Sequence, residues 1–379
     1  MKDSATVKFD YVETNDGLHE IVAKMSNAKN IALDTEADSL HHYYEKTCLL
    51  QVSFEEQHFI IDPLADIDIQ IFLSALKGKT LLFHGADYDL RMLKDSFGFI
   101  PEGPVVDTMI AAKMLNYEQL GLLALVQRFC DVTLSKTGQK SDWSRRPLTD
   151  AQIRYAVDDT RFLETVATTI LKEIEAKNRM DWYNEWVENV VAAAIQERPE
   201  PDPERIWRLK GLKDFSPREL AFVREIWHWR ENIAQNTDLP PFRVLENRYI
   251  LHLSIWAAST SNPKGDIDFR LPKNCTGNRL ITLQDALATA ADLPQDQWPT
   301  PLKRERTNKS GPKFKTLREI VAKIGKEHDL PPQIIASRAL LESISYHQVD
   351  SYDSMLEHTA VMKWQANLLA PQFAGVFEN

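Results

Sequence analysis

Cysteine is scarce in this sequence, and long apolar runs are absent from it. The chain of 379 residues has 3 cysteines, which lie far apart and form no C-x-x-C pair. This spacing excludes a disulfide framework and gives no support for a cysteine zinc site. The sequence also starts without a signal-peptide pattern and contains no run of about 18 apolar residues, which a membrane helix needs. We therefore expect a cytoplasmic protein that does not associate with a membrane.

An excess of basic residues is absent as well. The chain has 45 Lys and Arg residues against 55 Asp and Glu residues, so its formal net charge is −10. This charge excludes a protein that coats nucleic acid by bulk electrostatic attraction, because a polyanion needs neutralising cations. It does not exclude an enzyme that holds a nucleic acid in one local groove. The length predicts two or three domains, each large enough to bury a core.

The most informative stretch is NIALDTEA, residues 30–37. Its apolar residues predict a short buried strand, and Asp34 and Glu36 then alternate onto one face of the extended chain. Two neighbouring carboxylates repel each other unless a cation lies between them, and oxygen ligands suit Mg²⁺ or Mn²⁺. A D-x-E pattern after an apolar run also fits an ordinary exposed strand end. Further ligands must therefore be found elsewhere in the chain.

Two later segments supply acidic side chains on predicted helices. Residues 79–84 predict a buried strand that continues through a glycine into a helix carrying Asp87 and Asp89. Further on, a capping-box pattern predicts the start of a helix over residues 150–174. On that helix Tyr155 and Asp159 are four residues apart, so they share one face. Together with the β-rich start of the chain, these elements predict a mixed α/β domain.

Two proline-rich stretches divide the rest of the chain. The first is acidic and the second is basic. The segments that follow them resemble each other: in each, one helix ends at D-L-P-P and another helix follows, so we expect a small helical module to occur twice. The predicted division is an α/β domain at 1–195, a linker at 196–205, a helical domain at 206–292, a basic linker at 293–313 and a second helical domain at 314–379.

Three motifs carry a resemblance to a known family. IALDTEA, FHGADYDL and YAVDDTRFL, in this order, resemble the three exonuclease motifs of the DEDD nuclease superfamily, in the branch with tyrosine in the third motif. The most similar family is ribonuclease D, whose members end in two helical HRDC domains. The resemblance implies an α/β RNase H-like exonuclease domain, a mixed sheet with flanking helices, followed by two all-α HRDC-like domains.

The resemblance also implies the roles of particular residues. In the second motif it points to Asp89, with Asp87 as the alternative. In the third it selects Tyr155 and Asp159 and leaves the neighbouring Asp158 without a role. One position departs from the family pattern, since Ala37 stands where a bulky aromatic residue is common, so the fit of the terminal base is open. The implied metal ligands are Asp34, Glu36, Asp89 and Asp159, with Tyr155 as the residue that orients the attacking water.

The implied reaction is 3′-5′ exoribonuclease cleavage with two divalent cations, Mg²⁺ or Mn²⁺, and release of nucleoside 5′-monophosphates. The implied partner is RNA with a free 3′ end, such as a tRNA precursor or another structured RNA, and we expect a monomer. The same motifs also serve proofreading-type DNA exonucleases, which is one alternative. A catalytically silent RNA-binding adaptor is another, and the complete set of acidic residues argues against it.

Further side chains are candidates for RNA contact. His84 precedes the second motif and fits either a structural histidine or a substrate contact. The loop around Trp143, with Arg145 and Arg146, resembles a string common in the family and fits either RNA binding or a packed loop. Basic residues of the second linker could track phosphates or simply be solvated; they are Lys303, Arg304, Arg306, Lys309, Lys313 and Lys315.

Overall fold

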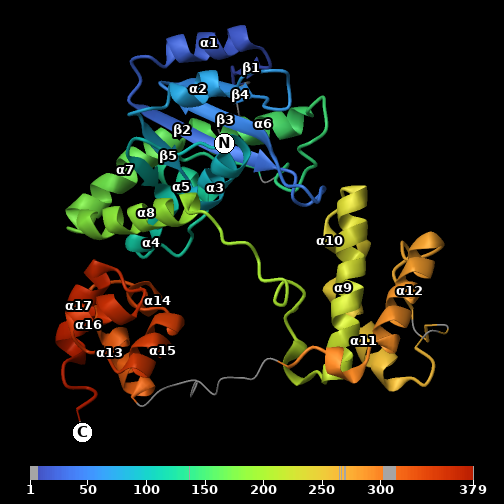
Figure 1. The fold of residues 1–379 in the computed structure, drawn as a ribbon. Coiled ribbons are helices and arrows are strands. Elements are labelled where there is room, and N and C mark those ends of the chain that lie inside the picture. Colours follow the sequence, from blue (N-terminus) through green and yellow to red (C-terminus); the bar gives the residue numbers. More distant parts are fainter. Residues whose placement is uncertain are drawn as a thin grey trace. The chain divides into compact units, whose positions relative to one another are not determined.

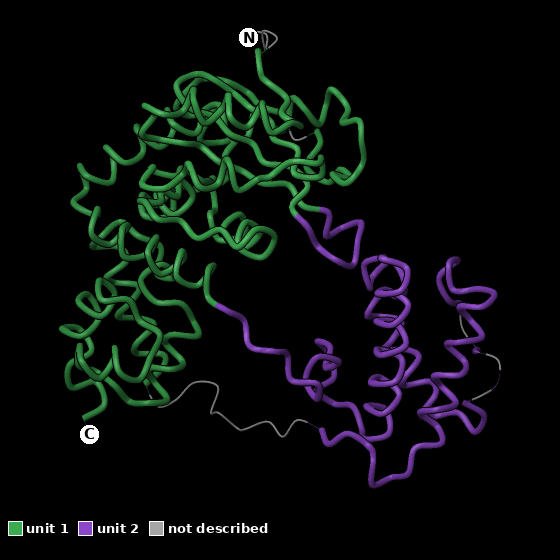
Figure 2. The backbone as a smooth tube through the Cα atoms, turned by 45° about the horizontal axis from the view of Figure 1, so that its top comes forward, with its two compact units in different colours: residues 1–37, 47–196, 306–379 green, residues 38–46, 197–305 purple. Residues whose placement is uncertain are grey.

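The computed structural model describes residues 7–135, 137–263, 265, 267–268, 270–301 and 313–378. The chain divides into two compact units, which Figure 2 shows in different colours. Unit 1 contains residues 1–37, 47–196 and 306–379, and unit 2 contains residues 38–46 and 197–305. The division after residue 196 lies at the start of the first predicted linker. A short loop from the α/β region, residues 38–46, belongs to unit 2, which the sequence did not suggest.

A six-stranded mixed sheet forms the centre of the α/β domain. The strand order is β1-β4-β3-β2-β5-β6, and β3 is antiparallel to both of its neighbours while the remaining pairs are parallel. The predicted strands are confirmed, and the sheet places β2 between β3 and β5. The strands are β1 Asp10–Val12, β2 Asn30–Ala37, β3 Thr47–Phe54, β4 Gln57–Ile61, β5 Thr80–Phe83 and β6 Val105–Asp107.

Helices cover both faces of this sheet, because successive strand residues point to opposite sides. Ile31 and Leu33 of β2 pack into one core with the helices that follow β1, β4 and β5, whereas Ala32 packs into a second core on the other face. Figure 1 shows these layers. The first face is covered by α1 Asn15–Lys24, α2 Gln70–Ser74 and α3 Ala86–Phe97, and the second by α4 Thr108–Met114, α5 Leu122–Cys130 and α7 Leu163–Ala176.

The helix that we expected over residues 150–174 is two helices. The first, α6 Asp150–Arg161, ends at Phe162, and α7 begins directly after it. The two helices pack against different clusters. Ala156 and Val157 of α6 contact β3 and β4 residues, whereas Leu163 and Ile170 of α7 join the second core. The break at Phe162 thus coincides with the change from one cluster to the other, which the continuous helical pattern does not show.

Two helical modules follow the α/β domain. Module 1, residues 206–292, lies in unit 2, and module 2, residues 314–378, lies in unit 1. Among the described residues, no helix is long and apolar enough to cross a bilayer. Module 1 contains α9 Pro217–Thr237, α10 Pro241–Val244, α11 Asn247–Ser259 and α12 Asn278–Asp292; module 2 contains α13 Phe314–Glu327, α14 Pro332–Ile335, α15 Arg338–His347, α16 Tyr352–His358 and α17 Lys363–Phe373.

Module 2 packs on the α/β domain through α8, Met180–Ile195. Trp182 stacks on Trp364 with ring centroids 5.1 Å apart, and Glu185 accepts hydrogen bonds from the backbone N–H groups of Lys363 (2.6 Å) and Trp364 (3.0 Å). Those N–H groups lie at the start of α17, where helices leave donors without internal partners. The contact therefore combines an aromatic stack with a helix cap.

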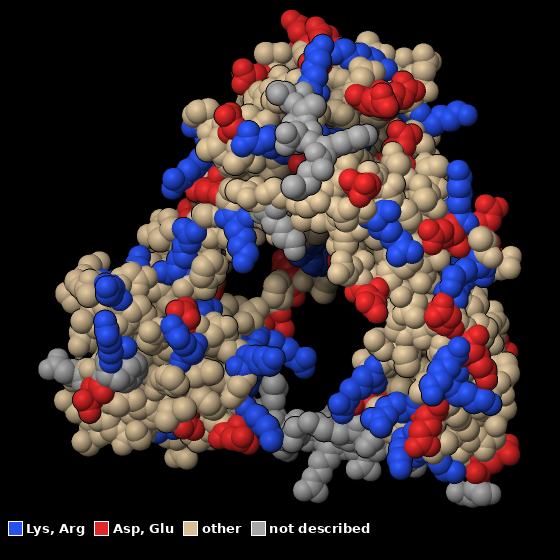
Figure 3. All heavy atoms as spheres, turned by 180° about the vertical axis from the view of Figure 1, so that it is seen from behind, with Lys and Arg blue, Asp and Glu red and all other residues tan. Residues whose placement is uncertain are grey.

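Charged side chains of both signs are mixed on the surface. Figure 3 shows Lys and Arg side chains interspersed with Asp and Glu over one face, without a continuous basic patch. Most of the basic linker predicted for phosphate contact, from Lys303 to Lys309, lies outside the described residues. Lys313 and Lys315 are described and stand at the start of α13, where Lys315 pairs with Glu319 at 3.9 Å.

Candidate active site

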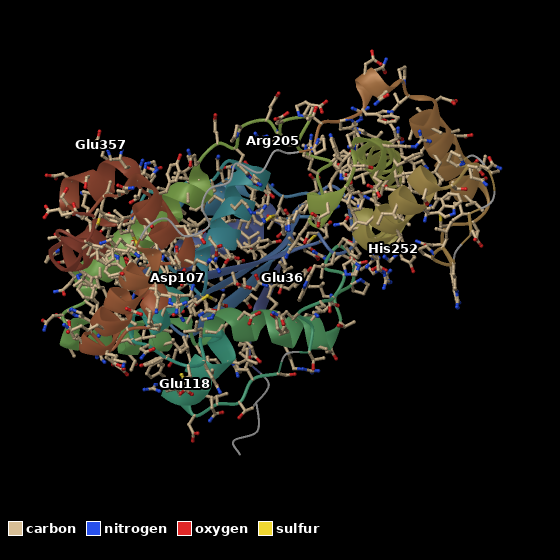
Figure 4. All side chains as sticks on the ribbon, turned by 90° about the horizontal axis from the view of Figure 1, so that it is seen from below. Glu36, Asp107, Glu118, Arg205, His252 and Glu357 are labelled. Carbon is tan, nitrogen blue, oxygen red and sulfur yellow. The ribbon has the colours of Figure 1, made fainter. Side chains whose placement is uncertain are left out.

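Strand β2 presents the first two acidic side chains. Its first half is anchored in the two cores, and the pleat then alternates Asp34 and Glu36 with the buried Thr35. The pairing of β2 with β3 is regular up to Glu36 and shifts between Glu36 and Ala37. Figure 4 shows Glu36 beside the strands of the sheet. The sheet therefore fixes both carboxylates on one face, as the alternation predicted.

Helix α3 places Asp89 directly against β2. The turn from β5 into α3 passes through Gly85, whose φ of 88° is a conformation that glycine adopts readily. Asp107 fixes this turn, since its side chain accepts hydrogen bonds from the N–H groups of Gly85 (3.0 Å) and Ala86 (2.9 Å). Asp89 is 5% exposed, whereas Asp87, on the same helix, is exposed. The burial of Asp89 favours it over the alternative at this motif.

A single oxygen of Asp89 connects α3 to the acid-bearing strand. Its Oδ1 accepts from the Thr35 backbone N–H at 2.9 Å and from the Thr35 hydroxyl at 2.6 Å. These bonds leave the second carboxylate oxygen for another role. Sequence reasoning did not single out Thr35, although its place between the two acids of D-T-E puts it opposite their face.

Helix α6 supplies Tyr155 and Asp159. The helix begins with the expected capping box, in which the Thr149 hydroxyl accepts from the Gln152 N–H at 3.3 Å. One turn apart on this helix, the Tyr155 phenol and the Asp159 carboxylate interact, and each affects the pKa of the other. The loop before α6 packs on the tyrosine: Gly138 has φ of 125°, and a Cβ there would lie 3.0 Å from the Tyr155 Cβ. A side chain at this position would crowd the tyrosine, and the positive φ also favours glycine.

All five of these side chains line one cavity of about 980 Å³. Within it, one oxygen each from Asp34, Glu36 and Asp159 lie within 4.8 Å of one another. In the part of the chain that the structure describes, no other acidic, histidine or cysteine group meets this criterion. Asp89 lines the same cavity but stands outside this trio. The cavity wall also includes residues 119–124 and 133–134, for which the sequence gave no signal.

The electrostatics of the pocket follow from the crowding of buried negative charge. Burial, followed by the charges of its acidic neighbours, holds the pKa of Asp34 well above its ordinary range. The same causes raise the pKa of Glu36 to about 9 and that of Asp159 to about 7. Burial also raises the pKa of Asp89 to about 7, although its bonds from Thr35 oppose this shift. Burial and then Asp159 raise the pKa of the Tyr155 phenol.

The donor set fits a divalent cation. Among the described residues, no Lys or Arg forms an ion pair with Asp34, Glu36 or Asp159. Clustered carboxylate oxygens without a basic partner are the ligands that Mg²⁺ and Mn²⁺ prefer. A bound cation would remove the repulsion that raises the pKa values of these groups.

The remaining candidates have different surroundings. His84 lines the pocket; its Nδ1 lies 2.9 Å from the Thr108 hydroxyl, and its Nε2 is buried without a hydrogen bond to any described residue. Trp143 is 1% exposed and packs with residues of β3, β4 and α6, so its surroundings favour the packed-loop alternative over RNA stacking. Arg145 is exposed and pairs with Asp142 at 3.0 Å.

Arg146 holds the loop to the sheet instead of projecting into the pocket. Its Nε and Nη2 donate to the two oxygens of Asp62 at 2.5 and 2.7 Å, and Nη2 also donates to the Cys48 carbonyl oxygen at 2.8 Å. The Tyr11 hydroxyl donates to Asp62 as well, at 2.5 Å. These bonds occupy the guanidinium group, so Arg146 has a structural role. Sequence reasoning missed Asp62, whose only signal is its place at the end of a strand.

A mixed sheet of this order, carboxylates converging from β2, α3 and α6, and a tyrosine beside them define a class, the metal-dependent 3′-5′ exonucleases. The sequence profile of a 3′-5′ exonuclease domain matches residues 9–175. Ribonuclease D of Pseudomonas paraeruginosa is 30% identical over 325 residues, which cover 83% of each chain. Ribonuclease D of Gluconacetobacter diazotrophicus is 28% identical over 348 residues, or 88% of this chain and 85% of the relative. The chain belongs to the ribonuclease D family.

The fold agrees with this membership. The structure of Escherichia coli RNase D, described as an exoribonuclease involved in structured RNA processing, matches with a TM-score of 0.72 over 98% of this chain and 99% of that chain, at 22% identity. The predicted fold class, an RNase H-like α/β domain followed by helical HRDC-like domains, is confirmed. The chain is a metal-dependent 3′-5′ exoribonuclease.

Proposed function

We propose that the unit 1 pocket removes nucleoside 5′-monophosphates one at a time from the 3′ end of RNA. The observation that supports this most directly is the trio of carboxylate oxygens within 4.8 Å of one another, without a basic partner among the described residues. A phosphodiester adds further negative charge, so it cannot enter this cluster unless cations are present. The proposed ligands are Asp34, Glu36, Asp89 and Asp159.

Each protein group has a role that its surroundings support. Two bound divalent cations would supply Lewis acidity at the phosphate and lower the pKa of a water. Asp89 would use the oxygen that Thr35 leaves open, while Thr35 keeps the carboxylate in a fixed orientation. The Tyr155 phenol stays protonated because its pKa is raised, so it can hold a water by hydrogen bonding in line with the phosphorus. No covalent enzyme intermediate is needed.

The wider assignment follows the same reasoning. We propose Mg²⁺ or Mn²⁺ as the cation, structured RNA such as tRNA precursors as the substrate, and a monomer in the cytoplasm as the working form. We assign residues 1–195 to the exonuclease domain and residues 206–292 and 314–379 to two HRDC-like domains that help to hold RNA. His84 remains a proposed substrate contact because it lines the pocket. Arg145, which is exposed, remains one as well.

Digestion of a 5′-labelled RNA with a 3′ hydroxyl tests the proposal. The RNA and a DNA of the same sequence are incubated with Mg²⁺, with Mn²⁺ and with EDTA. We expect a ladder that shortens from the 3′ end of the RNA, nucleoside 5′-monophosphates as products, and no digestion with EDTA. Digestion of DNA at the same rate would overturn the preference for RNA, and RNA binding without digestion would move the function to an adaptor.

A further inference from the structure

The D-L-P-P sequence occurs once in each helical module, and both copies have the same backbone. Asp238 follows α9 with φ of 47°, and Asp329 follows α13 with φ of 48°. In both copies the next residue closes the helix end: Leu239 N–H donates to Ala234 O at 3.0 Å, and Leu330 N–H to Gly325 O at 2.9 Å. The two prolines then begin a short helix, α10 or α14. The two aspartates are therefore equivalent positions of one repeated turn.

Both aspartates use their side chains to bind chain segments outside their own module. Asp329 accepts from Lys177 Nζ at 2.7 Å and from Asn116 Nδ2 at 3.2 Å, and both partners belong to the α/β domain. Asp238 accepts at Oδ1 from the backbone N–H groups of Tyr43 (3.0 Å) and Tyr44 (3.2 Å). The ring of His42, 2.7 Å from the second oxygen, and then these backbone bonds hold the pKa of Asp238 below its ordinary value.

The segment that Asp238 binds is the loop of residues 38–46, which lies in unit 2 with module 1 (Figure 2). Further contacts hold the loop there. The Tyr43 ring packs against the buried core of module 1, and its hydroxyl accepts from Gln235 Nε2 at 3.0 Å. Arg243 of α10 lies 2.9 Å from the ring of His41. Asp238 differs from these side chains in that it binds the backbone of the loop.

The loop is tied at its base to the strand that carries the acids. It begins at Asp38, two residues after Glu36, and ends where β3 starts. The Asp38 side chain is fully buried and accepts from the Lys46 N–H at 3.0 Å, while its carbonyl oxygen accepts from the N–H groups of His41 (2.7 Å) and His42 (2.9 Å). The loop thus closes on itself. Asp38 directly follows Ala37, the last residue of β2, so the base of the loop is continuous with the acid-bearing strand.

We propose that Asp238 is a positioning residue for the exonuclease reaction: by fixing the loop of residues 38–46 to module 1, it holds the Glu36 end of β2 in place. Asp329 occupies the same turn in module 2 but binds Lys177 and Asn116, which do not adjoin the acid-bearing strand in sequence. The duplicated turn therefore has two uses, one that attaches a module and one that also orders the active site. This inference rests on the proposed function.

Glycine is the substitution that isolates the carboxylate. Asp238→Gly removes the acceptor but keeps the positive φ, since glycine adopts this conformation freely. Asp238→Asn retains an oxygen for the two N–H groups and also tolerates this region. Asp329→Gly and Asp329→Asn are the matched controls, because they make the same changes in the same turn of the other module.

Two measurements on the full chain test the inference. Hydrogen exchange follows the amides of residues 34–48, and steady-state kinetics on a short single-stranded RNA separate kcat from KM. For Asp238→Gly we expect faster exchange in residues 38–46 and at the end of β2, and a kcat about tenfold lower with KM unchanged, as small misplacements of catalytic groups cost rate. Asp238→Asn should restore most of kcat, and Asp329→Gly should leave kcat unchanged.

The outcomes separate this inference from the proposed function. If exchange in residues 34–48 is the same in Asp238→Gly as in the unaltered chain, the positioning role is wrong. It is also wrong if kcat is unaltered, if KM alone rises, or if Asp329→Gly lowers kcat equally. If the unaltered chain fails to digest RNA while exchange still responds to Asp238→Gly, the proposed function fails and the attachment of the loop by Asp238 stands.

Discussion

The pocket carboxylates and the Asp62 carboxylate lie in the same α/β domain, but their surroundings are opposite. Asp62 is 4% exposed and has a bidentate Arg146, the Tyr11 hydroxyl and a backbone N–H of Leu64 as partners. Burial raises its pKa, but the hydrogen bonds from Arg146 and Tyr11 outweigh this, so the net shift is downward. In the pocket, burial and then the charges of Asp159 and Asp89 raise the pKa of Glu36 to about 9.

This difference distinguishes acids that stabilise the fold from acids that serve the reaction. A buried carboxylate with a guanidinium partner is satisfied within the protein, and removing one member leaves an uncompensated charge. A cluster of carboxylates without such a partner costs stability until a cation binds. The pocket therefore stores unfavourable repulsion in the metal-free chain. Substitutions in the two groups should act on different properties: activity in the pocket, and stability at Asp62.

The largest effect is expected at Asp159. Asp159→Asn removes one charge of the carboxylate trio and weakens cation binding, so we expect kcat/KM on RNA to fall about 10³-fold or more. Because the substitution also relieves repulsion, the thermal midpoint in EDTA should stay equal or rise. A rate assay and a melting curve of the same preparation check both parts. A clear drop in the midpoint without metal would place Asp159 with the stabilising acids and break the comparison.

Helix α3 carries one acid of the pocket and one exposed acid, so the two can be compared within a single helix. Asp89 is buried against Thr35 and lines the pocket, whereas Asp87 is exposed. We expect Asp89→Asn to lower kcat/KM about 10²-fold or more, and Asp87→Asn to leave most of the activity, since an exposed acid outside the pocket has no substrate to contact. Equal losses in the two variants would overturn the choice of Asp89 at this motif. Circular dichroism serves as the folding control for both.

A substitution of Tyr155 tests whether an uncharged side chain of the pocket also takes part in the reaction. Tyr155→Phe removes the hydroxyl that interacts with Asp159 but keeps the ring that packs against Gly138. We expect kcat to fall about tenfold to a hundredfold with little change in RNA affinity, because loss of one positioned hydrogen bond acts on the transition state. The measurement is single-turnover cleavage together with RNA binding in Ca²⁺. Unchanged turnover would remove the proposed role in holding a water.

The sequence was sufficient for the parts of the site that depend on local periodicity. Alternation along β2 placed Asp34 and Glu36 on one face, and the i, i+4 spacing placed Tyr155 beside Asp159. Both depend only on the geometry of a strand or a helix. The resemblance selected Asp89, and burial then supported it, since helical spacing alone does not distinguish it from Asp87.

The parts that the sequence could not give depend on contacts between distant segments. The bonds from Arg146 to Asp62 join residues that are 84 positions apart, and they change a proposed RNA contact into a structural pair. The break at Phe162 coincides with the change between the clusters on which α6 and α7 pack. Residues 38–46 likewise belong to unit 2, where they contact residues almost 200 positions away, Asp238 among them. No local pattern reports any of these.

Asp62→Asn is expected to affect stability and leave the chemistry intact. It keeps the shape of the side chain but leaves the Arg146 charge without its partner, so we expect the free energy of unfolding to fall by about 2–3 kcal/mol, less than for a fully enclosed pair because Arg146 is partly exposed. Urea denaturation measures this. The rate per folded molecule should stay within about twofold. A tenfold loss of rate at full folding would show that Asp62 acts on the pocket.

The smallest expected effect is on the pH dependence of stability. This dependence has opposite signs for the pocket carboxylates and for Asp62. Glu36, Asp89 and Asp159 have raised pKa values of about 9, 7 and 7, so the folded state holds more protons than the unfolded state above about pH 4. Their contribution to stability is therefore lost as pH rises from about 4 to 9 in EDTA. The contribution of Asp62 has the opposite sign and is lost only as pH falls below about 4, because its folded pKa is lowered.

Mg²⁺ should cancel the loss of stability that the pocket carboxylates cause at high pH, since a bound cation favours the ionised carboxylates. We therefore expect Mg²⁺ to raise the melting temperature more at pH 8 than at pH 5, and Asp159→Asn to reduce this difference. Melting curves in EDTA and in Mg²⁺ across this range measure it. A Mg²⁺ effect that is equal at both pH values would mean that the pocket carboxylates are already neutralised by the protein, as Asp62 is, and the distinction between the two groups would disappear.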